Sequence, residues 1–283
     1  ELHRFRNQIS KRMGGASGSK MKSVLAGIYI HIPFCSQFCT YCNFYSVKQL
    51  GLRERFVQAM VNEIKARKDF FKNIGSSVTT VYIGGGTPSV LLPHQLARIV
   101  DALTETFGLT FGDSGVQEFT IEVNPNDITP EYAAFLTSLG VNRVSMGMQS
   151  FDDSHLKWMN RRHTSAQAVE AFRVLRRAGF DNISVDVIFG IDGYAEGLNS
   201  TLSAILELDV EHISAYHLTI EPATRFGRML AKGEITCTSE QRSEEEFLTV
   251  HQRLTEAGFE HYEVSNFAKK SRRSRHNSSY WTG

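Results

Sequence analysis

The chain has 283 residues, enough for one barrel-sized α/β domain or two smaller domains. Its hydrophobic content of 41% and charged content of 22% are ordinary for a globular protein, and a formal net charge of +1 predicts no general attraction to nucleic acid or membrane surfaces. No apolar run approaches the ~20 residues that a transmembrane helix needs.

Residues 1–20 are basic, polar and rich in Gly and Ser, with no apolar segment of the kind found in signal peptides. We predict that they form a flexible leader and interpret Met21 as a native start. The scarcity of acidic residues leaves an Arg-rich organelle-targeting segment as the alternative.

From Gly27 onward, strand-like runs alternate with amphipathic helical patterns. Six strand–helix units with short connections predict an α/β fold over residues 21–222, a partial (β/α)6 barrel of the TIM type. A doubly wound open sheet is the alternative, and in both architectures functional groups gather where strands end. The regular alternation of strands and helices ends before residues 223–283, which we interpret as the barrel end and the start of a smaller C-terminal domain. The predicted strands span residues 27–32, 78–83, 118–123, 143–148, 183–189, 212–218 and 261–267.

Three of the four cysteines, Cys35, Cys39 and Cys42, follow the first strand with C-x3-C-x2-C spacing. Three thiols on one loop favour a metal or an iron–sulfur cluster over a disulfide. Zinc would need a fourth ligand, for which His31 is the candidate, whereas a four-iron cluster held by three cysteines leaves one iron open. Cysteines in this arrangement make no disulfide framework, which predicts a reducing compartment, the cytoplasm by default. Cys237 is interpreted as a buried or inert thiol.

Polar or glycine-rich segments end the other strands. The run of residues 84–88, Gly-Gly-Gly-Thr-Pro, fits a tight strand-to-helix turn, and no G-K-[ST] follows to favour a phosphate loop. A single polar residue at a strand end fits a cap or a hydrogen bond at the barrel end, but four on successive units favour a ligand with polar edges. These four are Glu122, Gln149, Arg161 and Asp186.

The cysteine motif, with the aromatic Tyr41 directly before the third cysteine, resembles the radical S-adenosylmethionine (SAM) superfamily. The resemblance implies a [4Fe-4S] cluster on Cys35, Cys39 and Cys42, whose open iron binds the amino and carboxylate groups of SAM. The reduced cluster would then release a 5′-deoxyadenosyl radical, while the protein orients and shields the cofactors. The SAM-binding positions that it implies are Tyr29, Tyr41, Gly85, Gly86, Thr87, Glu122, Gln149, Arg161 and Asp186.

Residues 29–280 resemble one branch, the oxygen-independent coproporphyrinogen dehydrogenases and the HemW-type haem chaperones. The dehydrogenases carry a further cysteine where this chain has Phe44, and they have a longer N-terminal segment. The resemblance therefore favours a chaperone with haem or porphyrin as cargo, a recipient haemoprotein and an electron donor as partners. Oxidation of coproporphyrinogen III in porphyrin biosynthesis is the alternative, which leaves open whether the chain is an enzyme. A structural zinc module would not explain the polar strand ends.

The motif His276-Asn277-x-x-Tyr280-Trp281 is similar to one that the chaperone group places near haem. His276 is thus a candidate haem ligand, and the five basic residues within 269–275 are candidates for the haem propionates. An exposed polar loop is the alternative. Residues 190–194 depart from the Gly-Leu-Pro-Gly-Gln turn of the family, and the region that follows the Tyr-Trp motif in the family is missing.

Overall fold

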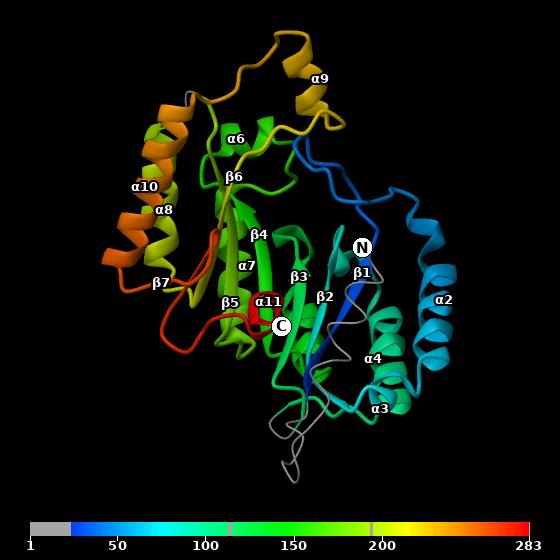
Figure 1. Cartoon of the computed structure of the whole chain (residues 1–283). Coiled ribbons are helices and arrows are strands. Elements are labelled where there is room, and N and C mark those ends of the chain that lie inside the picture. Colours follow the sequence, from blue (N-terminus) through cyan, green and yellow to red (C-terminus); the bar gives the residue numbers. More distant parts are fainter. Residues whose placement is uncertain (1–23, 113–114, 193–194, 283) are drawn as a thin grey trace, which may run out of the picture.

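The structure is a computed structural model that describes residues 24–112, 115–192 and 195–282 (Figure 1). The predicted leader, residues 1–20, lies outside the described residues, as do Gly193 and Tyr194 of the divergent turn. No helix in the described ranges is both long and apolar enough to cross a bilayer.

One sheet of eight strands forms the centre of the fold. The strands are β1 (Val24–Ile32), β2 (Ser76–Gly85), β3 (Glu118–Val123), β4 (Arg143–Gln149), β5 (Ile183–Phe189), β6 (His212–His217), β7 (Glu260–His261) and β8 (Asn266–Ala268). Their order is β1-β2-β3-β4-β5-β6-β8-β7. Strands β1 to β6 are parallel, whereas β8 is antiparallel to both β6 and β7. This topology confirms the predicted partial barrel, with six parallel strands in sequence order.

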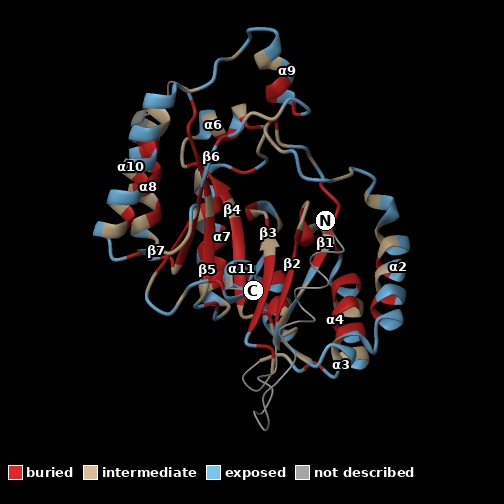
Figure 2. Ribbon diagram, in the orientation of Figure 1, coloured by how far each residue is buried: buried red, intermediate tan, exposed pale blue. Residues whose placement is uncertain are grey.

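Helices α2, α4, α8 and α10 lie on the outside of the curved sheet, with α2 and α4 beside β1 and with α8 and α10 beside β6 (Figure 1). The helices are α2 (Arg53–Ala66), α3 (Phe70–Asn73), α4 (Pro93–Phe107), α5 (Pro130–Ser138), α6 (Asp153–Trp158), α7 (Ser165–Arg177), α8 (Ala195–Glu207), α9 (Arg225–Ala231), α10 (Glu240–Glu256) and α11 (Arg275–Thr282). Apolar faces at helical spacing pack on the strands. Figure 2 shows the central strands β3, β4 and β5 as almost wholly buried.

Alternation along the parallel strands separates the core from the site. Phe119 and Ile121 of β3 are fully buried in the apolar core, whereas Glu122 faces the inside of the barrel. Ser145 of β4 and Asp186 of β5 likewise face inside, where a hydrogen bond of 3.2 Å joins their side chains. Because successive side chains point to opposite faces of a strand, one face forms the core and the other is free to carry polar groups.

The C-terminal segment differs from the sequence prediction in one respect. Instead of one strand over His261–Phe267, the chain forms two short strands, β7 and β8, joined by a turn in which the Tyr262 amide donates to the Asn266 carbonyl at 3.2 Å. A turn within the predicted strand reverses the chain. Strand β8 pairs with β6 and extends the barrel sheet. A separate smaller C-terminal domain stays a prediction.

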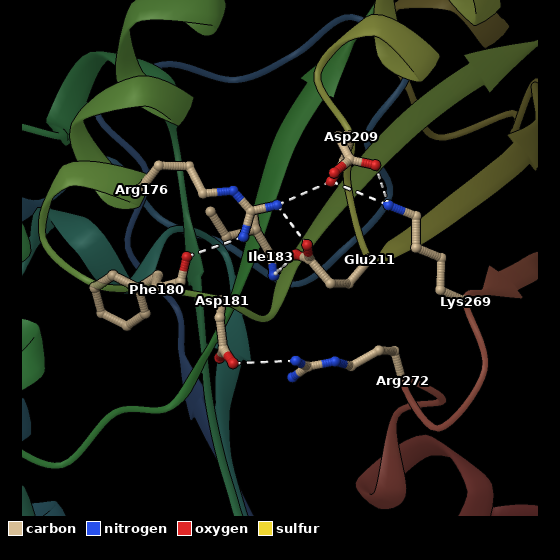
Figure 3. A network of polar contacts seen from close by, with 8 residues as sticks. All are labelled: Arg176, Phe180, Asp181, Ile183, Asp209, Glu211, Lys269 and Arg272. Carbon is tan, nitrogen blue, oxygen red and sulfur yellow. Dashed lines mark hydrogen bonds and ion pairs between the residues drawn. The ribbon is translucent and has the colours of Figure 1, made fainter.

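A polar network fastens this segment to the amino ends of β5 and β6 (Figure 3). Glu211 accepts hydrogen bonds from the Arg176 guanidinium at 2.5 Å and from the Ile183 amide at 2.9 Å. Lys269 forms an ion pair with Asp209, and Arg272 lies 3.0 Å from Asp181. The basic run is therefore partly engaged in contacts within the chain. Its members Lys269, Arg272 and Arg273 all have carboxylate partners.

Arg176→Met is expected to lower the free energy of unfolding by about 1 to 3 kcal/mol, because it leaves the largely buried Glu211 carboxylate without its cation. Methionine keeps the helix propensity of arginine. Arg177→Met on the same helix is the matched control. Its pair with Glu170 is more than half exposed, so we expect a change within about 0.5 kcal/mol. Urea unfolding measures the free energy of unfolding of both variants. Equal losses would contradict the stabilising role of the Arg176–Glu211 pair.

Candidate functional site

An open cavity of about 820 Å³ lies where the parallel strands end. The parallel strands place their carboxyl ends at one rim, so polar residues far apart in the sequence meet there. All of the predicted site residues except Tyr29 and His276 line this cavity. Those that do are Cys35, Cys39, Tyr41, Cys42, Gly85, Gly86, Thr87, Glu122, Gln149, Arg161 and Asp186.

The loop that carries the three cysteines is fixed at its base. The Cys35 amide donates to the Val47 carbonyl at 3.0 Å, and the Val47 amide donates to the Pro33 carbonyl at 2.6 Å. On the far side, the Thr40 amide donates to the Met159 carbonyl at 3.1 Å. These backbone contacts connect the loop to the neighbouring segments on both sides of the cavity.

The donor set fits an iron–sulfur cluster better than a single metal ion. Three thiols from one loop face one cavity, and each thiolate of a cluster binds a different iron, so the sulfurs need not converge on a point. No three His, Cys, Asp or Glu side chains of the described residues are gathered to hold a single ion. Both ring nitrogens of His31 are also engaged, with the Tyr29 hydroxyl at 3.2 Å and the Tyr45 carbonyl at 3.0 Å. The alternative of zinc with His31 as fourth ligand is therefore not supported.

A hydrogen-bonded chain links two of these cysteines across the cavity. The Arg161 guanidinium lies 3.3 Å from the Cys39 sulfur and donates to the Asn124 side-chain oxygen at 2.7 Å. The Asn124 amide group donates to the Thr87 hydroxyl at 3.2 Å, and that hydroxyl lies 3.5 Å from the Cys35 sulfur. The buried Nε of Arg161 has no partner among the described residues. A donor left in this state at a cavity wall fits a bound ligand with an acceptor atom.

The glycine turn brings bare backbone to the cavity wall. Gly85 has φ of +117°, which favours glycine, and its amide donates to the Glu122 carboxylate at 3.0 Å. A Cβ on Gly86 would lie 2.8 Å from the Phe34 carbonyl oxygen and 3.0 Å from the Cys35 sulfur. The turn therefore packs directly under the cysteine loop, and no side chain fits between them.

Gly86→Ala is expected to lower the free energy of unfolding by about 1 to 3 kcal/mol and to reduce the iron bound after reconstitution. The reason is that the added methyl group displaces the backbone that carries Cys35. Gly51→Ala is the control, because a Cβ there meets nothing within 4 Å. Thermal unfolding and iron analysis of both variants test this. A Gly86→Ala protein with unchanged iron content would show that the turn and the loop are not coupled.

Two carboxyl groups form the acidic floor of the cavity. Glu122 accepts a hydrogen bond from the Tyr82 hydroxyl at 2.8 Å, and Asp186 accepts one from Ser145 at 3.2 Å. Burial raises the pKa of Glu122 to about 7 and the pKa of Asp186 to about 6. Burial also raises the pKa of the Cys42 thiol. Paired carboxyl groups in such a floor can attract a cationic ligand once they are ionised.

Gln149 reaches the cavity through an irregularity at the end of β4. Its φ of +68° accompanies a shift in register, in which Gly147 pairs with Asp186 and Gln149 with Val187. A Cβ on Gly147 would lie 2.9 Å from the Gln149 side-chain nitrogen and 3.2 Å from the Arg161 guanidinium. The bulge turns Gln149 across the bare glycine toward Arg161.

Tyr29 and His276 lie elsewhere, and they lie near each other. Their ring centroids are 6.5 Å apart, and His276 also packs on Tyr82 at 5.2 Å. His276 is buried and bonded to the Thr80 hydroxyl at 2.8 Å, while its Nε2 has no partner among the described residues. Glu118 accepts from the backbone amides of Arg275 and His276 and holds the start of α11 against the inside of the barrel. Haem ligation by His276 stays a prediction.

Several cavity residues were missed in the sequence. Asn124 and Tyr216 stand at strand ends, which is the same signal that identified Glu122 and Asp186. Lys48, Arg225 and Arg228 belong to loops or to α9 and carried no local signal, because only the fold brings them to the cavity.

Comparison with known proteins agrees with this geometry. The profile of the radical SAM superfamily matches residues 29–202. The chain is 35% identical over 255 residues to the heme chaperone HemW of Lactococcus lactis, a match that covers 89% of this chain and 65% of that protein. It is also 35% identical over 260 residues to the heme chaperone HemW of Bacillus subtilis, covering 90% of this chain and 66% of that one.

Among solved structures, the coproporphyrinogen III oxidase HemN of Escherichia coli, a radical SAM enzyme, matches with a TM-score of 0.76. The two share 27% sequence identity over 88% of this chain and 56% of that chain. The chain thus spans about two thirds of the length of the curated relatives reported above.

Proposed function

The chain belongs to the radical SAM superfamily, and from this we propose that it forms part of a haem chaperone that carries a [4Fe-4S] cluster and SAM. The observation that carries the choice is Phe44, which stands where the coproporphyrinogen dehydrogenases have a further cysteine. The 35% identity to proteins named as haem chaperones, over about nine tenths of this chain, supports the same choice.

Each part of the cavity would have a distinct task. Cys35, Cys39 and Cys42 would hold three irons, and the bound cluster would supply an electron to SAM. The carboxylates of Glu122 and Asp186 would attract the positive charges of SAM, and Arg161 would position Cys39 through its 3.3 Å contact. The glycine turn would let the ligand approach the backbone.

The partners follow from this function and belong to the proposal. A haem carrier needs a recipient haemoprotein, and a redox cluster needs an electron donor. All four cysteines are free thiols, which supports a reducing compartment, and we propose the cytoplasm.

The test compares haem binding with porphyrinogen chemistry in full-length protein that has been reconstituted without oxygen. We expect haem to produce a saturable change in the Soret absorbance and to pass to an apo-haemoprotein. We expect coproporphyrinogen III to be decarboxylated no faster than by a Cys39→Ser control. Decarboxylation above that control would replace the chaperone with the oxidase, the activity named for the similar HemN structure.

A further inference from the structure

The mouth of the cavity differs in charge from its floor. We define the cavity lip as Phe38, Phe44, Lys48, Arg225 and Arg228, all of which line the cavity. The floor carries carboxyl groups, whereas the lip carries cations and aromatic rings. One cavity therefore offers a region for a cationic ligand and a separate region for an anionic one.

The lip cations are free of carboxylate partners. None of Lys48, Arg225 and Arg228 forms an ion pair with any carboxylate of the described residues. The Lys48 ammonium lies 4.7 Å from the centre of the Phe38 ring, and the Arg228 guanidinium donates to the Ala223 carbonyl at 3.1 Å. Their charges are available to a ligand.

The aromatic part of the lip is exposed. Phe44 is 75% exposed and Phe38 is 42% exposed, although both residues line the cavity. Exposed rings beside unpaired cations fit a flat, apolar ligand that carries carboxylates, because the rings can stack on its face while the guanidinium groups bind its acidic groups.

The basic run at 269–275 fits such a ligand less well. Lys269, Arg272 and Arg273 already pair with Asp209, Asp181 and Glu260, and Figure 3 shows the first two pairs at the amino ends of β5 and β6. These cations lie away from the cavity lining.

We propose that the lip binds the carboxylates and one face of an aromatic macrocyclic dicarboxylate, the tetrapyrrole cargo of the proposed function. This inference rests on that function and adds the place and orientation of the cargo. The carboxylates face Lys48, Arg225 and Arg228, the macrocycle lies over Phe38 and Phe44, and the acidic floor remains for SAM.

The test is a titration of the full-length protein with haem and with haem dimethyl ester, followed by Soret absorbance. The triple variant Lys48→Gln, Arg225→Gln, Arg228→Gln is expected to bind haem at least about tenfold more weakly. Wild type is expected to bind haem dimethyl ester more weakly than haem. The triple variant is expected to bind the two ligands equally. Phe44→Ala is expected to weaken the binding of both forms equally.

The matched control is Arg55→Gln, Lys68→Gln, Arg173→Gln, which removes the same charge from exposed positions outside the cavity lining. It is expected to bind haem as wild type does. Iron content after reconstitution shows whether each variant has folded. If the triple variant does not fold, the single variant Arg228→Gln replaces it, and we expect a smaller loss of haem affinity.

The outcomes separate the two proposals. If wild type binds no haem, the proposed function fails. If wild type binds haem and the lip variant binds it equally well, the lip is wrong and the function stands. A control triple that loses as much affinity as the lip triple would attribute the effect to net charge and overturn the lip assignment.

Discussion

Cys42→Ser is expected to abolish cluster binding while leaving the barrel folded. A serine hydroxyl stays protonated where a thiolate is needed, and soft iron–sulfur centres select sulfur ligands. After anaerobic reconstitution we expect about four irons per chain in wild type and less than about one in the variant, with no SAM-dependent change in the EPR signal of the reduced cluster. The fold should persist, because Cys42 is a free thiol outside the apolar core.

Cys237→Ser is the control for this experiment. Cys237 is exposed and does not line the cavity. The iron content and EPR response of the Cys237→Ser protein should therefore match those of wild type. Circular dichroism should be the same for all three proteins. A Cys42→Ser protein that still holds four irons, or a wild type that binds zinc in their place, would contradict the cluster.

The contribution of Glu122 and Asp186 to the stability of the ligand-free chain is expected to fall as the pH rises from about 5 to about 8. The folded-state pKa is about 7 for Glu122 and about 6 for Asp186, above their ordinary values of 4.5 and 3.8. The folded state therefore binds more protons than the unfolded state in this window, and the protonated carboxyls contribute stability that is lost as they ionise. Since the open cavity admits water, we expect about 2 kcal/mol between these limits, less than the full shifts would imply.

Glu122→Gln should flatten this dependence, because glutamine cannot ionise. Urea unfolding at several pH values measures it. Glu207→Gln, which removes an exposed carboxyl of α8, should leave the wild-type slope unchanged. If the free energy of unfolding changes with pH equally in wild type and in Glu122→Gln, then Glu122 has the same pKa in the folded and unfolded chains.

SAM affinity should change with pH in the opposite direction. Ionised Glu122 attracts the cationic ligand, so affinity should rise by up to about tenfold per pH unit below the pKa and level off above it. Calorimetric titration of SAM into the reconstituted protein measures this rise. An affinity that is the same at pH 6 and pH 8 would remove Glu122 from the SAM site.

Much of the fold could be predicted because its signals are local. The strand over Glu118–Val123 and the strand over Ile183–Phe189 begin and end at the predicted residues, since a change of hydrophobic period marks each end. The same locality explains why Glu122 and Asp186 line one cavity. Once strands are parallel and in sequence order, a polar residue at the end of each one must reach the same rim.

What local patterns could not supply is the partner of each side chain. The basic run at 269–275 suggested a ligand site, yet Lys269 and Arg272 meet Asp209 and Asp181, some 60 and 91 positions away in the chain. His276 looked like a loop residue or a haem ligand, and it packs inside the barrel against Tyr82 and Thr80. Charge and residue type show that a group needs a partner, but they do not identify it.

The cavity therefore has two origins. Its cysteine loop, glycine turn and acidic floor could be predicted from the sequence. They consist of short motifs at strand ends, which meet at one rim in any barrel whose parallel strands follow the order of the sequence. The bulge that turns Gln149 inward, the links from Arg161 through Asn124 and Thr87 to Cys35, and the lip of Lys48, Arg225 and Arg228 came only with the assembled chain. Those contacts join residues that are neighbours in space alone, and their energies arise from packing and charge over distances that no local window of sequence contains.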